Sequence, residues 1–342
     1  MTSHPDFNKE TNGTDAAKAF ATQIRGKTIL ITGASPNGLG QATAHAIAGN
    51  APGLIIISGR SQAKLDETAA GLRKSFPSVP VRILIVDLGS FKSIRTAAAE
   101  VNAYPEDIDV LINNAGVMAI AERQLTEDGL EMQFGTNHIG HFLFTNLILG
   151  KLEATAAKSS TPGSTRIINL SSFGHQLGPV RFSDPNFEGK KELPSEEVAN
   201  WDLIKSFYKI EKTNGYEAWA SYGQAKTANV LFALSLRDHL YKRGILSFAV
   251  HPGGINTDLS RNMSSELYDG LMNIMDPNSF KTHDQGVSTT IVAAFDPKLD
   301  EKSGPYFDDC QVGQPNPWAT NAKSAEKLWT LSEEIVGQKF PL

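Results

Sequence analysis

The sequence has few of the features that mark secreted, membrane-spanning or nucleic-acid-binding proteins. Its single cysteine, Cys310, excludes an internal disulfide framework and fits a reducing compartment. No stretch reaches the ~18 consecutive apolar residues of a membrane span, and residues 1–27 lack the apolar core of a signal peptide. The net charge of −5 argues against binding to a phosphate backbone. We therefore expect a cytoplasmic protein with no membrane span and no nucleic-acid partner.

Clusters of metal ligands are also missing. His138, His141 and His251 lie at positions that show no ligand spacing, so we expect them to be structural residues. The sequence predicts no metal site.

What the sequence does contain is a repeat of short apolar runs separated by helical patterns. Strands are expected at residues 28–32, 53–58, 81–87, 109–115, 166–172 and 246–252. These runs are continuously apolar, as in parallel strands that helices cover on both faces. Alternation of strands and helices builds right-handed crossovers. The pattern predicts a single α/β domain over residues 26–342, with a doubly wound parallel sheet between two helical layers.

Three regions depart from this repeat. Residues 1–25 read as a polar, frayed arm that ends in a short helix before Gly26. Insertions at about 173–220 and 259–285 are expected to build the mouth of a pocket. The first insertion carries the aromatic residues Phe182, Phe187, Trp201, Phe207, Tyr208 and Trp219. They favour a bulky, partly apolar substrate, and the alternative is that they pack the insertion onto the domain.

The stretch LITGASPNGLG, residues 30–40, predicts a strand, a glycine turn and the start of a helix. Backbone N–H groups and the positive end of a helix dipole at such a turn bind phosphate. The spacing of Gly33, Gly38 and Gly40 differs from the G-x-G-x-x-G pattern of dinucleotide sites. By itself the stretch fits a nucleotide site and a structural turn about equally well.

The end of the second strand carries Arg60, with Lys64 one helical turn later, and no acid lies between residues 53 and 65. An acid near this point binds the ribose 2′-hydroxyl of NAD, whereas a cation accommodates the 2′-phosphate of NADP. The pattern favours NADP(H). The alternative is that Arg60 is a solvated surface charge.

Tyr222 and Lys226 stand four residues apart on an expected helix, which places them on one face. A tyrosine ordinarily has a pKa near ~10, and an adjacent ammonium lowers it toward the range useful for acid–base catalysis. The Y-x-x-x-K pattern occurs by chance in many helices, so its meaning depends on the other motifs.

Together these motifs resemble the short-chain dehydrogenase/reductase family of the classical type. The resemblance rests on the glycine turn, VDL with Asp87, NNAG at 113–116, the asparagine of GTNHIGHF, a serine after the fifth strand, Y-x-x-x-K and HPGGINT at 251–257. It covers about residues 27–260 and implies a Rossmann-like three-layer α/β/α sandwich. LTEDGLEMQFGTNHIGHFLFTNLIL and the late GPYFDDC and AEKLWTLSEEIVG segments look like its retinol-dehydrogenase-like branch, which includes WW-domain oxidoreductases and many fungal reductases.

The resemblance implies a catalytic role for each matching residue. Ser172 would orient the substrate carbonyl, and Tyr222 would donate or remove its proton. Lys226 would lower the pKa of the tyrosine and bind the nicotinamide ribose, and Asn137 would hold a water that links Lys226 to solvent. Ser171 is the alternative to Ser172, because a one-residue shift of register in the strand would exchange them.

The resemblance also implies the contacts of an NADP(H) cofactor. Leu39 would lie under the pyrophosphate, Asp87 at the adenine and Asn114 at the adenosine ribose, while Ile255 and Thr257 would hold the carboxamide. The full set expected to bind the cofactor is Gly33, Ser35, Asn37, Gly38, Leu39, Gly40, Arg60, Lys64, Asp87, Leu88, Asn114, Ala115, Gly116, Tyr222, Lys226, Pro252, Gly253, Ile255 and Thr257.

The glycine turn departs from the family pattern. Four residues instead of three separate Gly33 from Gly38, and Pro36 removes one N–H donor. Side chains of Ser35 and Asn37 would compensate as donors.

The leading interpretation is an NADP(H)-dependent enzyme, a fungal-type reductase, that interconverts a carbonyl and an alcohol on a bulky, partly apolar small molecule. One alternative is an epimerase or dehydratase of the same family. Another is an NADP(H)-binding regulator without activity, against which the complete set of four catalytic residues argues. The sequence is compatible with a homodimer and with a monomer.

Overall fold

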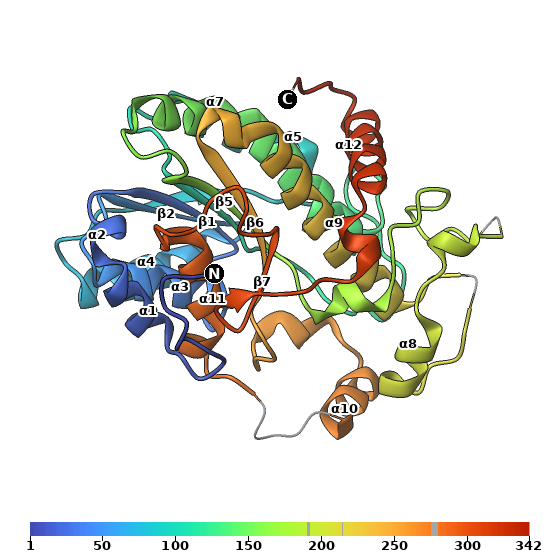
Figure 1. The fold of residues 1–342 in the computed structure, drawn as a ribbon. Coiled ribbons are helices and arrows are strands. Elements are labelled where there is room, and N and C mark those ends of the chain that lie inside the picture. The colour runs from blue at the N-terminus through green and yellow to red at the C-terminus, as the bar shows by residue number, and fades with distance from the viewer. Residues whose placement is uncertain (190–191, 214, 275–279, 342) are drawn as a thin grey trace.

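The computed structural model describes residues 1–189, 192–213, 215–274 and 280–341. Its centre is a sheet of eight strands in the order β3-β2-β1-β4-β5-β6-β7-β8 (Figure 1). The strands are β1 (Thr28–Thr32), β2 (Leu54–Gly59), β3 (Val81–Ile85), β4 (Val110–Asn113), β5 (Thr165–Leu170), β6 (Ile245–His251), β7 (Tyr306–Asp308) and β8 (Gln311–Val312). The pairs from β3 to β7 are parallel, and β8 pairs antiparallel with β7.

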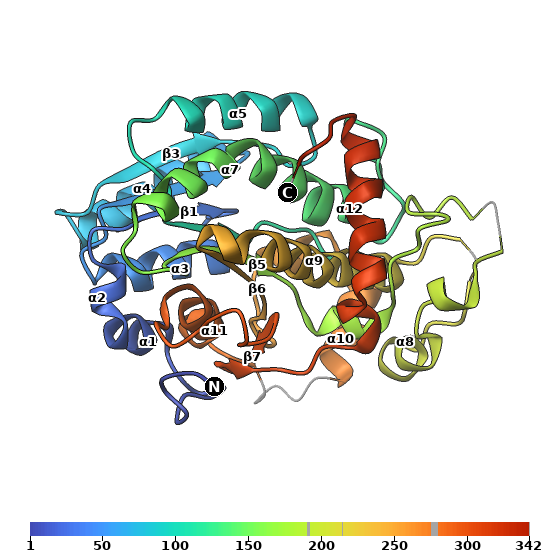
Figure 2. The same ribbon diagram turned by 45° about the horizontal axis from the view of Figure 1, so that its top comes forward.

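Helices cover both faces of the sheet (Figure 2). The main helices are α1 (Gly13–Ala19), α2 (Ala21–Ile24), α3 (Leu39–Ala48), α4 (Gln62–Ser75), α5 (Phe91–Ala103), α6 (Met132–Phe134), α7 (Gly140–Lys158), α8 (Trp201–Tyr208), α9 (Ala218–Leu240), α10 (Ser265–Ile274), α11 (His283–Phe295) and α12 (Ala322–Val336). A π-helix (Gly135–Ile139) joins α6 to α7. In the described ranges, none of these helices is both long and apolar enough to cross a membrane.

The alternation of side chains along β1 explains the two helical layers. Ile29 and Ile31 pack into one core cluster with residues of α3, α4 and α11. Leu30 points to the other face, into a cluster with residues of α5, α7, α9 and α12. Since every residue of β1 is buried, its uninterrupted apolar sequence follows directly from the two covered faces. The predicted three-layer, doubly wound α/β fold is confirmed.

The order of strands reverses between β1 and β4. From β1 the sheet continues through β2 to one edge, and from β4 it continues through β5 to the other edge. Open α/β sheets bind ligands at such a switch point, outside the carboxyl ends of the strands. The six predicted strands are present with ends that differ by at most two residues. Strands β7 and β8 were not predicted, because they have three and two residues and are joined by a left-handed turn at Asp309 and Cys310.

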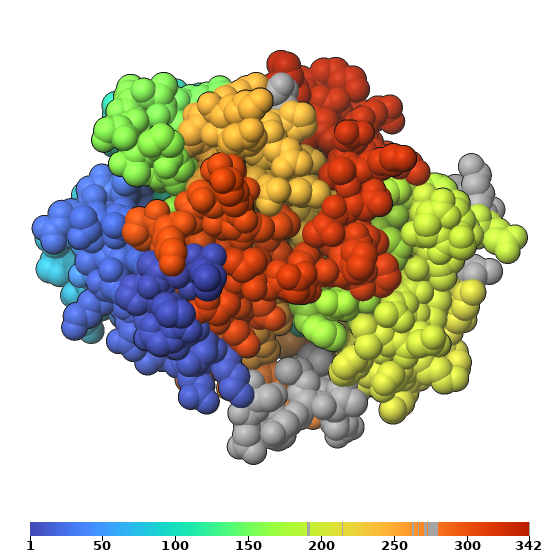
Figure 3. Space-filling model, in the orientation of Figure 1, coloured from blue at the N-terminus to red at the C-terminus, as the bar shows by residue number. Residues whose placement is uncertain are grey.

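The N-terminal residues are not frayed, so that expectation was wrong. Ala16, Phe20 and Ile24 recur at intervals of four residues and are almost completely buried. The Thr14 N–H and hydroxyl both donate to the carboxylate of Asp284 on α11, and Ser3 does the same with Asp296. Figure 3 shows the dark-blue N-terminal residues lying against the orange-red surface of the C-terminal third. The expected short helix before Gly26 is α2.

Candidate active site

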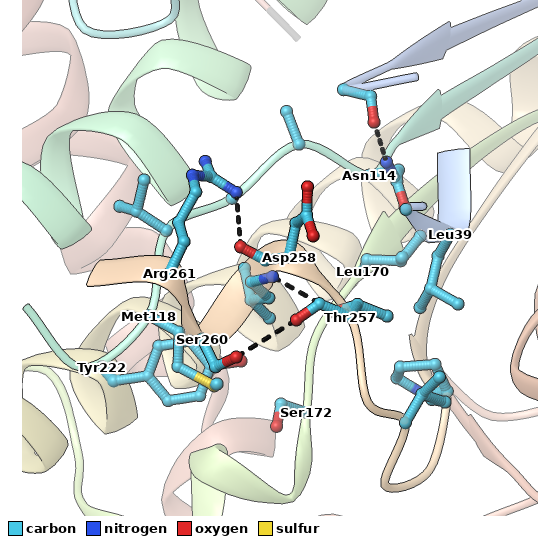
Figure 4. Close-up of a pocket in the computed structure, with 18 of the residues that line it drawn as sticks. Leu39, Asn114, Met118, Leu170, Ser172, Tyr222, Thr257, Asp258, Ser260 and Arg261 are labelled. Atoms are coloured by element: carbon cyan, nitrogen blue, oxygen red, sulfur yellow. Dashed lines mark hydrogen bonds between the residues drawn. The ribbon is translucent and has the colours of Figure 1, made fainter. Parts of the chain in front are cut away.

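A cavity of about 690 Å³ opens at the carboxyl edge of the sheet. One side, which we call the sheet wall, is formed by the turns that follow β1, β2, β3 and β4. The other side, the insertion wall, is formed by Phe207, Tyr208, Trp219, Tyr268, Met272 and Phe280. Figure 4 shows Leu39 and Asn114 toward the sheet wall, and Ser172, Met118 and Tyr222 toward the other end.

Most of the residues predicted from the sequence line this one cavity. They are Gly33, Ser35, Gly38, Leu39, Arg60, Lys64, Asp87, Leu88, Asn114, Ala115, Gly116, Ser172, Tyr222, Lys226, Pro252, Gly253, Ile255 and Thr257. Asn37, Gly40 and Asn137 do not line it. Residues spread over more than two hundred positions therefore meet at a single site, as the strand order requires.

The glycine turn brings three segments into direct backbone contact. Gly33 has a φ of +71°, and a Cβ on it would lie 2.6 Å from the Cα of Ala115. A Cβ on Gly40 would lie 2.5 Å from the carbonyl oxygen of Gly33. Both positions exclude a side chain, because real Cβ atoms do not approach other atoms so closely. Gly33 and Gly38 of this turn line the cavity at the start of α3.

The additional residue in the turn is accommodated by Asn37, which adopts a left-handed conformation with a φ of 57°. Its N–H donates to Oε1 of Gln41 at 3.0 Å, and its carbonyl oxygen lies 3.2 Å from Nε2 of His283 on α11. The extra residue is therefore held toward α11, outside the cavity lining. A phosphate contact by the Asn37 side chain, as the sequence suggested, has no support in this placement.

The two candidate serines after β5 have different partners. The Ser171 hydroxyl donates to the main-chain oxygen of Lys226 at 2.8 Å, so it fastens the strand to α9. The Ser172 hydroxyl accepts from the N–H of Gly174 at 3.0 Å, and its interaction with Tyr222 lowers the pKa of that phenol. The geometry thus supports Ser172 as the serine that faces the reacting groups.

Tyr222 and Lys226 lie one turn apart on α9, and both are at least 95% buried. Lys226 Nζ donates to the main-chain oxygen of Leu170 at 3.0 Å and lies 5.5 Å from the centre of the Tyr222 ring. Burial lowers the pKa of Lys226 to about 8. Burial raises the pKa of Tyr222 to about 12, against the opposing effect of its interaction with Ser172. Burial therefore dominates the pKa of Tyr222 in the protein alone, and the expectation that Lys226 lowers this pKa stays a prediction.

Asn137 lies in the π-helix, beneath the cavity rather than in its wall. Its side chain is held at both ends by Val117, with Oδ1 accepting from the N–H at 2.8 Å and Nδ2 donating to the carbonyl at 2.9 Å. A Cβ on Gly116 would lie 3.2 Å from Asn137 Oδ1 and 3.8 Å from Lys226 Nζ. Asn137 and the Lys226 ammonium thus flank the same glycine. Such π-helical turns are frequent at functional sites.

The aromatic residues of the first insertion divide into two groups. Phe207, Tyr208 and Trp219 line the cavity, and the rings of Tyr208 and Trp219 stack with centres 4.0 Å apart. Phe187 lies under the guanidinium of Arg181, and Phe182 lies under Lys327. The packing interpretation therefore applies to Phe182 and Phe187, and the substrate interpretation stays a prediction for the three aromatics that line the cavity.

The cavity rim carries three cations. Arg60 and Lys64 come from the segment after β2, and within the described ranges no acidic side chain forms an ion pair with either. The third, Arg261, was not predicted, and its Nη1 donates to the main-chain oxygen of Asp258 at 2.8 Å (Figure 4). Burial lowers the pKa of Arg261, and the like charge of Arg60 lowers it further. The part of the chain that the structure describes holds no group of three or more metal-ligating side chains.

Known proteins that are similar to this chain include dehydrogenases and an oxidoreductase. A family model described as short chain dehydrogenase matches residues 27–183. The protein is 38% identical to Oxidoreductase fscI of Fusarium equiseti over 72% of this chain and 95% of that protein. It is 36% identical to retinol dehydrogenase 13 of Mus musculus over 92% of this chain and 85% of that protein.

Solved structures show the same fold. An uncharacterised protein from Mycobacterium paratuberculosis superposes with a TM-score of 0.64 at 27% identity, over 94% of this chain and 98% of that chain. The NADPH-bound carbonyl reductase from chicken fatty liver superposes with a TM-score of 0.58 at 21% identity, over 85% of this chain and 94% of that chain.

Proposed function

We propose that this chain, which belongs to the short-chain dehydrogenase/reductase family and to its retinol-dehydrogenase-like branch, is an NADP(H)-dependent reductase of bulky, partly apolar carbonyl compounds. The family makes it an oxidoreductase that acts on carbonyl and alcohol groups. The observation that carries the proposal is the meeting of Ser172, Tyr222 and Lys226 with the glycine turn in one cavity.

The sheet wall fits a dinucleotide. The backbone at Gly33 and Gly40 leaves no room for side chains, and Gly38 forms the N-terminal cap of α3. A phosphate at this point would meet main-chain N–H groups and the positive end of the helix dipole. When bound, the cofactor supplies or accepts the hydride.

Tyr222 and Ser172 would act on the oxygen of the substrate. A phenol whose pKa is raised to about 12 carries its proton at neutral pH, so Tyr222 is ready to donate it to a developing alkoxide. The Ser172 hydroxyl would donate a hydrogen bond to the same oxygen. The amine of Lys226, held by the Leu170 carbonyl, lies beneath the tyrosine. This arrangement favours the reductive direction.

The cations of the rim support the choice of NADP(H) over NAD(H). Arg60 and Arg261 repel one another, and their like charges share one rim of the cavity. An anion between them would remove that repulsion, and charge-assisted hydrogen bonds from guanidinium to phosphate are among the strongest in proteins. The 2′-phosphate, which distinguishes NADP from NAD, is the group that Arg60 would meet in this proposal.

The insertion wall supports a bulky, partly apolar substrate. Phe207, Trp219, Tyr268 and Met272 offer ring and thioether surfaces in the same cavity as Tyr222. Pockets with walls of this kind bury the apolar parts of a ligand and use a few polar groups to orient it.

A panel of ketones, aldehydes and alcohols of increasing size, followed at the nicotinamide absorbance with NADPH and NADH, tests the proposal. We expect turnover of bulky carbonyls with NADPH. Tyr222→Phe is expected to lower kcat by about 100- to 10,000-fold while the Kd for NADPH stays unchanged. Tyr241→Phe, the same change at an exposed tyrosine outside the cavity lining, serves as the control. Full activity of Tyr222→Phe would refute the mechanism.

A further inference from the structure

The buried histidine His141 takes no part in the proposed reaction, yet it touches two parts of the site. It lies in the first turn of α7 and is 2% exposed. Its Nδ1 is 3.0 Å from the main-chain oxygen of Asn137, and its Nε2 is 2.9 Å from Oγ1 of Thr32. One imidazole ring thus joins the π-helix to the end of β1.

The partners of the ring determine where its proton lies. The Asn137 carbonyl can only accept a hydrogen bond, so Nδ1 carries the proton. Burial lowers the pKa of His141 to about 4, so the ring is neutral at pH 7 and Nε2 has no proton. Nε2 therefore accepts, and the Thr32 hydroxyl donates to it at 2.9 Å rather than to the Ile112 carbonyl oxygen, which lies 3.4 Å away.

The Thr32 hydroxyl connects His141 to the cofactor side of the cavity. Its oxygen accepts the main-chain N–H groups of Asn114 at 2.9 Å and Ala115 at 3.0 Å. With its proton directed to His141, the hydroxyl uses its donor and both acceptor positions. Asn114 and Ala115 form the turn after β4 that lines the sheet wall. Because the unprotonated Nε2 of His141 takes the proton of the Thr32 hydroxyl, both acceptor positions of that hydroxyl stay available for this turn.

We propose that His141, in its neutral Nδ1–H form, is a positioning residue that aligns the Asn137 carbonyl and, through Thr32, the Asn114–Ala115 turn. Asn137 is then fixed on two sides, because Val117 holds its side chain and His141 holds its carbonyl. The effect of His141 on turnover rests on the proposed function, but the position of the proton on Nδ1 of its neutral ring does not. This proposal departs from the sequence expectation of a purely structural histidine.

His138 provides a matched control within the same motif. It is 1% exposed, and burial lowers its pKa to about 3. Its Nε2 lies 2.9 Å from Oγ of Ser332 on α12, whose own proton goes to the Leu328 carbonyl at 2.7 Å. The Ser332 oxygen must accept, so His138 carries its proton on Nε2. Two buried histidines three residues apart are thus expected in opposite neutral forms.

The experiment compares three variants with the wild-type protein. His141→Phe removes the hydrogen bonds to Asn137 and Thr32. His138→Phe is the same substitution, and it removes the hydrogen bond to Ser332 on α12. His141→Asn is the conservative variant, because Asn146 of the same helix donates from Nδ2 to the carbonyl four residues earlier at 2.8 Å. This variant keeps the bond to Asn137 and loses the bond to Thr32. The readouts are imidazole-nitrogen NMR of the protein without cofactor, NADPH Kd by fluorescence, and kcat across pH.

We expect NMR to find His141 in the Nδ1–H form and His138 in the Nε2–H form. His141→Phe is expected to lower kcat by about 10- to 100-fold and to weaken NADPH binding, because small displacements of aligned groups cost this much. It is also expected to shift the pH profile of kcat. His141→Asn is expected to recover kcat but not NADPH affinity. His138→Phe is expected to lower Tm and leave both constants unchanged.

The proposal fails if His141 carries its proton on Nε2 or is charged at neutral pH. It also fails if His141→Phe and His138→Phe lower Tm alike and leave kcat and NADPH Kd unchanged. Should the variants not fold, the NMR result on the wild-type protein decides. A wild-type protein that binds NADPH but reduces no carbonyl would refute the proposed function, while the NMR and NADPH Kd measurements would still test the role of His141.

Discussion

The sheet wall and the insertion wall of the cavity are built from different parts of the chain. In the sheet wall main chains touch one another: the Asn114 N–H bonds to Thr32, and a Cβ on Gly33 would overlap Ala115. In the insertion wall four of the six side chains come from α8 and α10, two helices that pack on each other. The first wall depends on backbone geometry and the second on the size of a few side chains.

This difference implies a division of tasks. A wall made of backbone contacts holds a constant group in a constant place, which suits a cofactor. A wall made of side chains on added segments can change its shape without disturbing the sheet, which suits the selection of a substrate. Changes to the sheet wall should therefore have large effects on all substrates, and changes to the insertion wall small effects on some.

The largest effect is expected for Gly33→Ala. The φ of +71° is strained for alanine by about 1–3 kcal/mol, and the new Cβ would lie 2.6 Å from the Ala115 Cα. We expect a lower Tm and at least about a tenfold loss of NADPH affinity, measured by thermal unfolding and fluorescence titration. Gly71→Ala is the control, because nothing lies within 4 Å of that position in α4. Equal effects of the two changes would contradict the distinction between the walls.

Acid should destabilise the fold around the cavity through its buried neutral histidines. Burial lowers the pKa of His141 to about 4 and that of His251 to about 3, whereas the unfolded chain takes up protons near pH 6.5. The unfolded state therefore binds more protons between these values, and stability is lost as pH falls below about 6.5. Each histidine contributes up to about 1.4 kcal/mol per pH unit. Urea unfolding from pH 7 to pH 5 measures this slope, and His141→Phe should reduce it.

Much of the sheet wall could be predicted from residue types. Gly33, Gly38 and Asn114 follow strands whose apolar sequences are plain, and parallel strands bring their carboxyl ends to one edge. These positions can be recognised in the sequence because the backbone conformation there requires one particular type of residue.

Other features depend on neighbours that are distant in the sequence. The link from His141 to Thr32 joins residues 109 positions apart, so no local pattern marks it. Arg261 belongs to no sequence motif. Its relevance follows from its closeness to Arg60, a residue after β2 that lines the same cavity. The raised pKa of Tyr222 results from burial, which the Y-x-x-x-K spacing does not report.

An intermediate effect is expected for Arg60→Ala, at the part of the sheet wall that is proposed to bind the cofactor. Loss of a charge-assisted hydrogen bond to the 2′-phosphate costs about 1.5–3 kcal/mol, or about 10- to 100-fold in Kd. We expect this loss for NADPH and almost none for NADH in parallel titrations. Arg25→Ala, an exposed arginine outside the cavity lining, is the control. Equal weakening of NADPH and NADH would instead place Arg60 near a phosphate that both cofactors share.

The smallest effect is expected at the insertion wall, for Phe207→Ala. This partly buried ring on α8 faces the cavity and lies edge-on to Phe173, with ring centres 5.7 Å apart. Its removal takes away part of an apolar contact worth about 1.5–3 kcal/mol when complete, so KM for a bulky carbonyl should rise about three- to tenfold. KM for a small aldehyde and the NADPH Kd should stay unchanged. Phe182→Ala, at an insertion ring that packs under Lys327, should leave every KM unchanged. If Phe207→Ala raised the KM of small and bulky substrates equally, the insertion wall would not select substrates by size.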